Sequence, residues 1–182
     1  VELTYRNLGF DQSSGVDIQF RWGADFEDLG PLKVIPGSVN VSSTATYALD
    51  NIREEIAGIE QTDYTGTTFG QPDYRVTTRV GYRPNRNLGL NLNWRYVPPL
   101  DHWRSINDPE TDYEGAGPYN IFDLSGSYSL RRGLRMNAGV QNLFDREPEI
   151  TNRSATSSGA GYTSRYYDTL GRAYYIGISA EF

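Results

Sequence analysis

The stretch LGLNLNWRY, from Leu88 to Tyr96, decides the fold class because apolar and polar side chains alternate along it. One side carries Leu90, Leu92, Trp94 and Tyr96, and the other carries Gly89, Asn91, Asn93 and Arg95. Successive side chains of a β-strand point to opposite faces, so a period of two predicts a strand with one apolar and one hydrated face.

The same alternation recurs along most of the chain. It is clear at 16–25, 74–83, 122–130, 134–141 and 174–182, and weaker in a truncated first segment and a Ser/Thr-rich third segment. We therefore predict an all-β, antiparallel fold with about eight strands, at roughly 1–8, 15–27, 38–50, 73–84, 88–98, 119–131, 134–143 and 171–182. Most are about ten residues long, as a tilted membrane-spanning strand is, whereas soluble strands usually have about five or six residues.

The connections between these strands alternate in length. Short turns at 85–87 and 131–133 and a medium one at 30–37 alternate with long polar loops at about 51–72, 99–118 and 144–170. Outer-membrane barrels have short turns at the periplasmic rim and long loops outside the cell. The pattern therefore predicts that the three long loops are extracellular.

The composition supports a sheet with a hydrated face and excludes several function classes. The chain has 182 residues, of which 37% are hydrophobic, with 14 Tyr, 19 Gly and no Cys. A net charge of −6 argues against nucleic acid as a partner. The sequence contains no run of about 18 apolar residues, so it predicts no transmembrane helix. The first residue already lies in a strand pattern with no signal peptide before it, so we expect a fragment.

Alternation alone also fits a soluble antiparallel sandwich with one buried face. Two features favour a membrane barrel. The polar face carries charged residues deep inside long strands, and aromatic side chains gather near the strand ends, as in the interfacial girdles of membrane barrels. These aromatic residues are Trp22, Phe26, Tyr82, Trp94, Tyr96, Tyr128 and Tyr174.

The C-terminal quarter carries a recognisable series of motifs. It reads Gly139-Val140-Gln141-Asn142-Leu143-Phe144-Asp145, then Pro148, Tyr167-Asp168, Gly171-Arg172, Tyr174-Tyr175 and a terminal Phe182. This series resembles the C-terminal signature of TonB-dependent receptors, and Arg6-Asn7-Leu8 with Ser14-Gly15-Val16-Asp17 resembles a strand pair of the same family. The last strand also resembles the signal read by the outer-membrane barrel-assembly machinery, at Tyr175, Gly177, Ala180 and Phe182, although Ala180 is smaller than usual.

The resemblance implies a receptor in the outer membrane of a Gram-negative bacterium. Such a receptor has a barrel of about 22 strands around an N-terminal plug domain, and TonB acts on the plug to drive uptake of a scarce nutrient. Residues 1–182 would form the C-terminal segment of that barrel, without the plug and without the TonB-contacting box. Siderophore, cobalamin and oligosaccharide receptors share this ending, so these ligand classes stay open.

The loop at 99–118 holds the candidate ligand residues. Its side chains suited to a ligand are His102, Trp103, Asp112 and Tyr113, among several further carboxylates. The carboxylates do not have the spacing of a calcium loop, and His102 is the only histidine, so we predict no metal site, no cofactor and no catalytic residues. Arginines on the polar strand faces would line the lumen, where they either dock the acidic side of a plug or steer an anionic ligand, or solvate the wall and pair with Asp17, Asp25 or Asp123. These arginines are Arg21, Arg75, Arg79, Arg95 and Arg135.

The leading hypothesis is thus a transporter fragment and not an enzyme. A first alternative is a complete eight-stranded outer-membrane barrel that acts as a pore or structural protein. A second is a soluble, secreted carbohydrate-binding sandwich.

Overall fold

The computed structural model describes residues 9–54, 56, 58, 60–110, 113–149 and 166–181. Its strands are β1 (Phe10–Asp25), β2 (Ser38–Glu54), β3 (Thr62–Asp63), β4 (Tyr74–Arg83), β5 (Leu88–Val97), β6 (Tyr119–Arg131), β7 (Leu134–Gln141) and β8 (Ala173–Ala180). Three short 3₁₀ helices lie in the connections: η1 (Phe26–Asp28), η2 (Gly30–Val34) and η3 (Trp103–Ile106). Within the described ranges, no helix has the length and apolar character needed to span a membrane.

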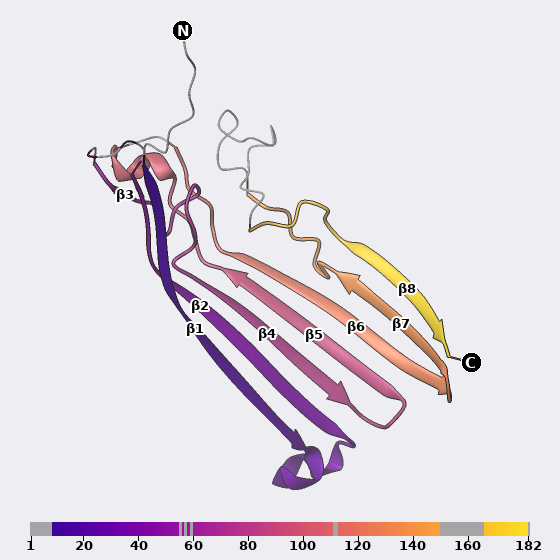
Figure 1. The fold of residues 1–182 in the computed structure, drawn as a ribbon. Coiled ribbons are helices and arrows are strands. Elements are labelled where there is room, and N and C mark those ends of the chain that lie inside the picture. Colours follow the sequence, from indigo (N-terminus) through magenta and orange to yellow (C-terminus); the bar gives the residue numbers. More distant parts are fainter. Residues whose placement is uncertain are drawn as a thin grey trace.

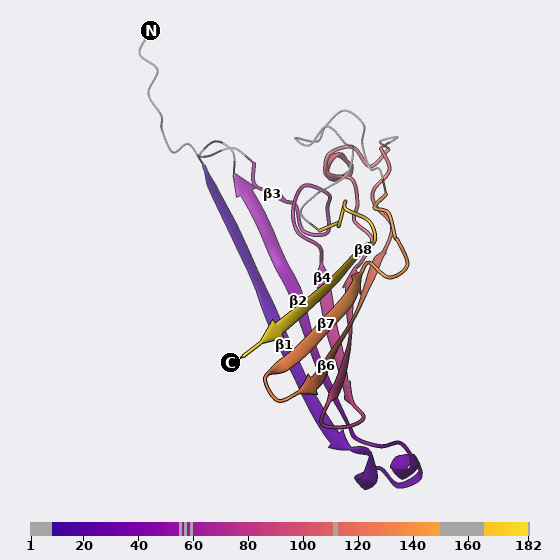
Figure 2. The same cartoon turned by 90° about the vertical axis from the view of Figure 1, so that its right-hand side faces the viewer.

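The strands form one antiparallel sheet in the order β1-β2-β4-β5-β6-β7-β8, and the short β3 pairs with β2. Figure 1 shows the short turns gathered at the lower end of the sheet and the long connections at the upper end. We call these the turn end and the loop end. The sheet is strongly curved (Figure 2), and β1 and β8 are its two edges.

The predicted strands from the second to the eighth are confirmed, with adjusted bounds. The predicted strand at 1–8 lies outside the described residues. The strand predicted at 15–27 begins earlier, at Phe10, because a β-bulge between Ser14 and Gly15 breaks the alternation that sequence reasoning relies on. The strand predicted at 38–50 extends to Glu54, and the medium turn at 30–37 contains η2.

The register places the apolar sides of all the long strands on one face of the sheet. A single row of paired residues crosses it from edge to edge through Trp22, Val41, Val80, Leu92, Leu124, Val140 and Tyr174. The neighbouring row on the opposite face runs through Gly23, Asn40, Gly81, Asn91, Ser125, Gly139 and Tyr175. The sheet therefore has one continuous apolar face and one continuous polar face.

The apolar face is not covered by any other part of the described chain. Ile18 is 61% exposed and Ile176 is 73% exposed. So large an apolar surface is unfavourable in water and requires apolar surroundings. In the described residues, this face therefore does not form the buried interior of a sandwich.

Aromatic rings gather where the apolar face approaches each end of the sheet. Towards the loop end, a series of ring contacts of 5.4 to 6.4 Å between centroids joins Tyr74, Tyr96, Trp94, Phe122 and Phe144. At the turn end, Phe26 packs edge-on against Tyr82, whose hydroxyl donates to the Pro36 carbonyl. These two bands match the aromatic girdles of membrane barrels.

Candidate functional site

Two of the long connections at the loop end fold together. Thr67 bridges to Asp101 and Leu100 bridges to Ala116. The Thr68 N–H donates to the Asp101 carbonyl at 2.8 Å, and the Asp101 N–H donates to the Gly66 carbonyl at 2.9 Å. We call the described residues of 60–73 and 98–118 the loop module, because these bonds make the two connections one folded unit.

A small hydrophobic core lies beneath the loop module. It consists of Val97, Leu100, Ala116, Tyr119, Ile121 and Tyr167. Leu100 is only 1% exposed, and Tyr167 comes from the third long connection. Burial raises the pKa of the Tyr167 hydroxyl to about 12. This core thus lies at the mouth of the sheet and joins the second and third long connections to the ends of β5 and β6.

A cluster of aromatic side chains extends across the loop module. Ring centroids are 5.0 Å apart for Tyr64 and Phe69, 6.2 Å for Phe69 and Trp103, 5.8 Å for Trp103 and His102, and 4.9 Å for His102 and Tyr113. We call these five side chains the aromatic cluster. Its edge-on and stacked contacts hold the rings in fixed positions.

Two arginines lie over this cluster. The Arg53 guanidinium lies 4.8 Å from the centre of the Phe69 ring. The Arg104 guanidinium lies 4.6 Å from the Tyr113 ring and 5.3 Å from the Trp103 ring. These distances are those of cation–π contacts. Arg53 is also ion-paired with Asp11, whose Oδ2 accepts from its Nη2 at 2.6 Å, so positive charge beside the flat apolar surface comes mainly from Arg104.

The structure brings together three of the four predicted ligand residues. Trp103 and Tyr113 both contact His102, whereas Asp112 lies outside the described residues. His102 is 3% exposed and its Nδ1 accepts from the Arg104 N–H at 3.2 Å, so it supports the other rings from below. Burial, with a smaller contribution from the Arg104 charge, lowers the pKa of His102 below 6.5.

Sequence reasoning missed Arg53, Tyr64, Phe69 and Arg104. Arg104 follows Trp103 directly, and an arginine beside an aromatic residue is a signal that could have found it. Arg53 lies at the end of β2 and Phe69 in the connection that follows it, and only the tertiary fold brings them near Trp103. Across the described ranges, no group of three or more His, Asp or Glu side chains is placed to hold a metal ion.

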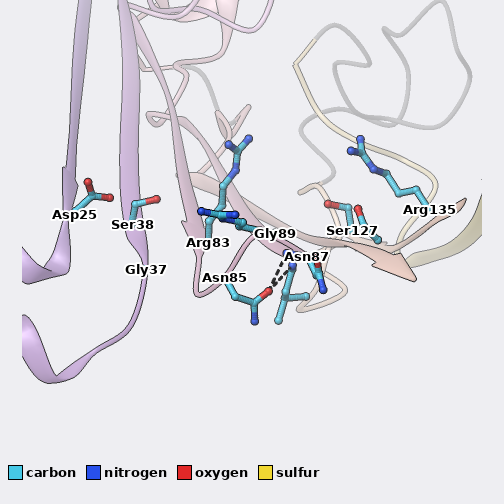
Figure 3. Close-up of a pocket in the computed structure, with 12 residues that line it drawn as sticks. Asp25, Gly37, Ser38, Arg83, Asn85, Asn87, Gly89, Ser127 and Arg135 are labelled. Atoms are coloured by element: carbon cyan, nitrogen blue, oxygen red, sulfur yellow. Dashed lines mark hydrogen bonds between the residues drawn. The ribbon is translucent and has the colours of Figure 1, made fainter. Parts of the chain in front are cut away.

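The polar face holds a second candidate region, a hollow of about 560 Å³ at the turn end (Figure 3). Asp25 and Ser38 lie on one side of it, and Ser127 and Arg135 on the other. Because residues from β1 to β7 line the same hollow, the sheet curves with its polar face inward. The hollow is mainly cationic: Arg83, Arg86 and Arg135 line it together with Asp25.

Two further sequence predictions concern the polar face and the last strand. The predicted pairing of Arg95 with Asp123 is present, at 3.3 Å. Tyr175 and Gly177 point to the polar face of β8 and Ala180 to the apolar face, opposite Gly139, Asn137 and Leu134. Phe182 lies outside the described residues, so the assembly signal stays a prediction.

The family model described as TonB dependent receptor-like, beta-barrel, matches residues 2–143. This chain belongs to that family. The predicted family and all-β barrel class are confirmed.

Three curated relatives belong to enterobactin systems. The ferric enterobactin receptor PirA of Pseudomonas aeruginosa is 30% identical over 115 residues, which is 61% of this chain and 15% of PirA. A second ferric enterobactin receptor of the same species is 29% identical over 119 residues, covering 54% of this chain and 16% of the relative. The ferrienterobactin receptor of Escherichia coli is 21% identical over 195 residues, covering 100% of this chain and 25% of the relative.

Solved structures of the P. aeruginosa ferric enterobactin receptor PfeA share the fold. A PfeA mutant in complex with enterobactin superposes with a TM-score of 0.59 at 20% identity, covering 93% of this chain and 22% of PfeA. PfeA in complex with BCV-L6 gives the same values. The TonB-dependent receptor chain described here thus spans 15% to 25% of its curated relatives.

Proposed function

We propose that the receptor containing this chain imports a ferric siderophore across the outer membrane of a Gram-negative bacterium, driven by TonB. The observation that carries the proposal is the aromatic cluster with Arg53 and Arg104 at the loop end. The relatives support the siderophore class, since the three curated ones are receptors for enterobactin complexes.

The chemistry of the cluster suits an anionic iron chelate that presents flat aromatic rings. Such a ligand stacks on Phe69 and Tyr113, which are both exposed at the surface. Its negative charge is attracted by the Arg104 guanidinium, whereas the charge of Arg53 is already paired with Asp11. An oligosaccharide would also stack on aromatic rings, but a neutral one gains nothing from the charge of Arg104, and the same holds for the corrin ring of a cobalamin.

The two faces of the sheet support the membrane arrangement. The apolar face, with its two aromatic bands, faces lipid, and the polar face lines the lumen. Further strands continue the barrel from the open edges β1 and β8, since an unpaired strand edge is unfavourable in hydrocarbon. A plug domain outside this chain fills the lumen and contacts TonB, and the barrel-assembly machinery reads the end of β8. This arrangement makes the protein a transporter and not an enzyme.

The ligand class is tested by titrating the purified full-length receptor with ferric enterobactin while following tryptophan fluorescence. Replacing Arg104 by Ala removes the charge and the contacts with Trp103 and Tyr113. Arg104 is exposed, so we expect affinity to fall about two- to fivefold, the scale of a cation–π contact at an exposed site. Arg132→Ala, in the short turn at the opposite end, is the matched control and leaves affinity unchanged. Saturable binding of cobalamin or a neutral oligosaccharide, with none of ferric enterobactin, contradicts the proposal.

A further inference from the structure

The chain turns sharply after β7 through two residues in a left-handed conformation. Asn142 has a φ of 49° and Asp145 has a φ of 55°. Non-glycine residues rarely adopt this conformation, and Asn and Asp tolerate it better than most. Asn142 is also only 1% exposed. A buried polar residue in an unusual conformation persists only where its surroundings hold it there.

Hydrogen bonds to its polar groups keep Asn142 in this conformation. Its Nδ2 donates to the Arg146 carbonyl at 3.0 Å, and its Oδ1 accepts from the Arg146 N–H at 2.8 Å. Its backbone N–H donates to Oδ1 of Asp123 on β6 at 3.0 Å. The next residue, Leu143, donates its N–H to the Phe122 carbonyl at 2.7 Å. The root of the third long loop is therefore fastened to β6.

Asp123 itself belongs to the lumen wall. Its Oδ2 accepts from Asn93 Nδ2 at 3.1 Å and from Arg95 Nη2 at 3.3 Å, both on β5. It lines a hollow of about 330 Å³ on the polar face together with Arg79 and Gln141. One carboxylate thus holds two strands of the wall and the root of an outer loop at the same time.

The contacts continue from this root to both legs of the loop. The Arg146 carbonyl accepts from the Tyr119 hydroxyl at 3.2 Å, and the Asp168 carbonyl accepts from the same hydroxyl at 3.1 Å. Asp145 accepts from the Arg172 N–H at 2.8 Å. Between these contacts, Tyr167 packs into the core beneath the loop module. The position of the third loop and that of the aromatic cluster therefore depend on one another.

We propose that Asp123 is a positioning residue that, from inside the barrel, fixes the described ends of the third long connection, 142–149 and 166–172, and thereby retains ligand at the aromatic cluster. The carboxylate touches neither the ligand nor the cluster and acts through Asn142. The statement about ligand retention rests on the proposed function, whereas the statement about loop position does not.

A spin label on the loop tests the proposal directly in the full-length receptor. Leu170 is 86% exposed, and these 182 residues contain no cysteine, so Leu170→Cys gives one labelling site here once any cysteine elsewhere in the receptor is replaced by serine. We expect Asp123→Ala to make the label clearly more mobile and to speed dissociation of ferric enterobactin about tenfold, as loss of a charged hydrogen bond predicts.

Two variants separate the carboxylate's role from a general defect. Asp123→Asn keeps an oxygen that accepts from the Asn142 N–H, so the label stays within the parent's mobility. Ser125→Ala changes the neighbouring residue on the same face of β6 and leaves both readouts unchanged. If Asp123→Ala does not assemble, Asn142→Gly replaces it: glycine keeps the left-handed turn but loses both side-chain bonds to Arg146, and the label is again released.

An unchanged label in the assembled Asp123→Ala or Asn142→Gly receptor overturns the proposal. Equal mobilisation of a label at Val34→Cys, which is exposed in η2 at the turn end, also overturns it, because the effect is then global. Receptors that release the loop label but never bind ferric enterobactin contradict the proposed function and leave the positioning role intact.

Discussion

Replacing Leu100 by Ala should open the loop module without disturbing the strands. Leu100 is a fully buried member of the core beneath the loop module, and its backbone exchanges both hydrogen bonds of a bridge with Ala116 in the same connection, at 2.8 and 2.7 Å. Removing a fully buried leucine side chain loses its burial and leaves a cavity, which together cost about 3 kcal/mol.

That cost sets the size of the expected effect. Since about 1.4 kcal/mol corresponds to a factor of ten, the population of the opened module rises roughly 100-fold. Amide hydrogens exchange with solvent when such local opening occurs. The N–H groups of Thr68, Asp101 and Ala116, all bonded within the module, should therefore exchange roughly 100-fold faster.

Hydrogen exchange of the full-length receptor, read by mass spectrometry of peptides that cover 64–72, 98–104 and 113–120, measures this change. Leu32→Ala is the matched control, because Leu32 is an exposed leucine at the turn end and its loss leaves no cavity. Acceleration of less than about threefold in these peptides refutes the assignment of Leu100 to the core beneath the module. Equal acceleration in β4 and β6 refutes the view that the module opens by itself.

Three further predictions test the faces, the pH response and the turn end. Ile18→Arg, on the apolar face of β1, should lower the amount of receptor assembled in the outer membrane because an arginine facing lipid costs about 2–4 kcal/mol. Gln19→Arg, on the polar face, should be tolerated. Equal assembly of both variants contradicts the assignment of faces. The pKa of His102 is lowered in the folded module, so the unfolded module binds more protons, and the stability of the module is complete above pH 6.5 and falls as pH drops below it. Amide exchange in the module, corrected for its intrinsic pH dependence, should therefore accelerate towards pH 5. His102→Asn should flatten that pH profile. Gly37 has a φ of 91°, and a Cβ there would meet the Arg83 carbonyl. Gly37→Ala should therefore reduce the amount of assembled receptor, measured by heat-modifiable gel migration. Gly30→Ala, where a Cβ meets nothing nearby, should reduce it less.

The strands could be predicted from sequence because each carries its own period-two signal. Leu88–Tyr96 alternates so regularly that β5 has nearly the predicted bounds. The early start of β1 was not predictable, since the bulge at Gly15 shifts the phase of alternation and only pairing with β2 restores it.

The candidate site was predictable only in part, for a physical reason. His102, Trp103 and Tyr113 lie within one connection, so their composition alone pointed to a ligand loop. Arg53 and Phe69 reach them through tertiary packing, which leaves no local pattern in the sequence. The buried position of His102 likewise follows from the core beneath it and not from its neighbours in sequence.

The central claim is that this chain forms part of the barrel of a TonB-driven importer of ferric siderophores. Uptake of iron-55 supplied as ferric enterobactin tests it most directly, in cells that express the full-length receptor as their only receptor for that chelate, with and without TonB. We predict uptake that requires both the receptor and TonB and that falls when Arg104 is replaced by Ala. Iron-55 uptake that is equal with and without the receptor, or that persists without TonB, contradicts the account.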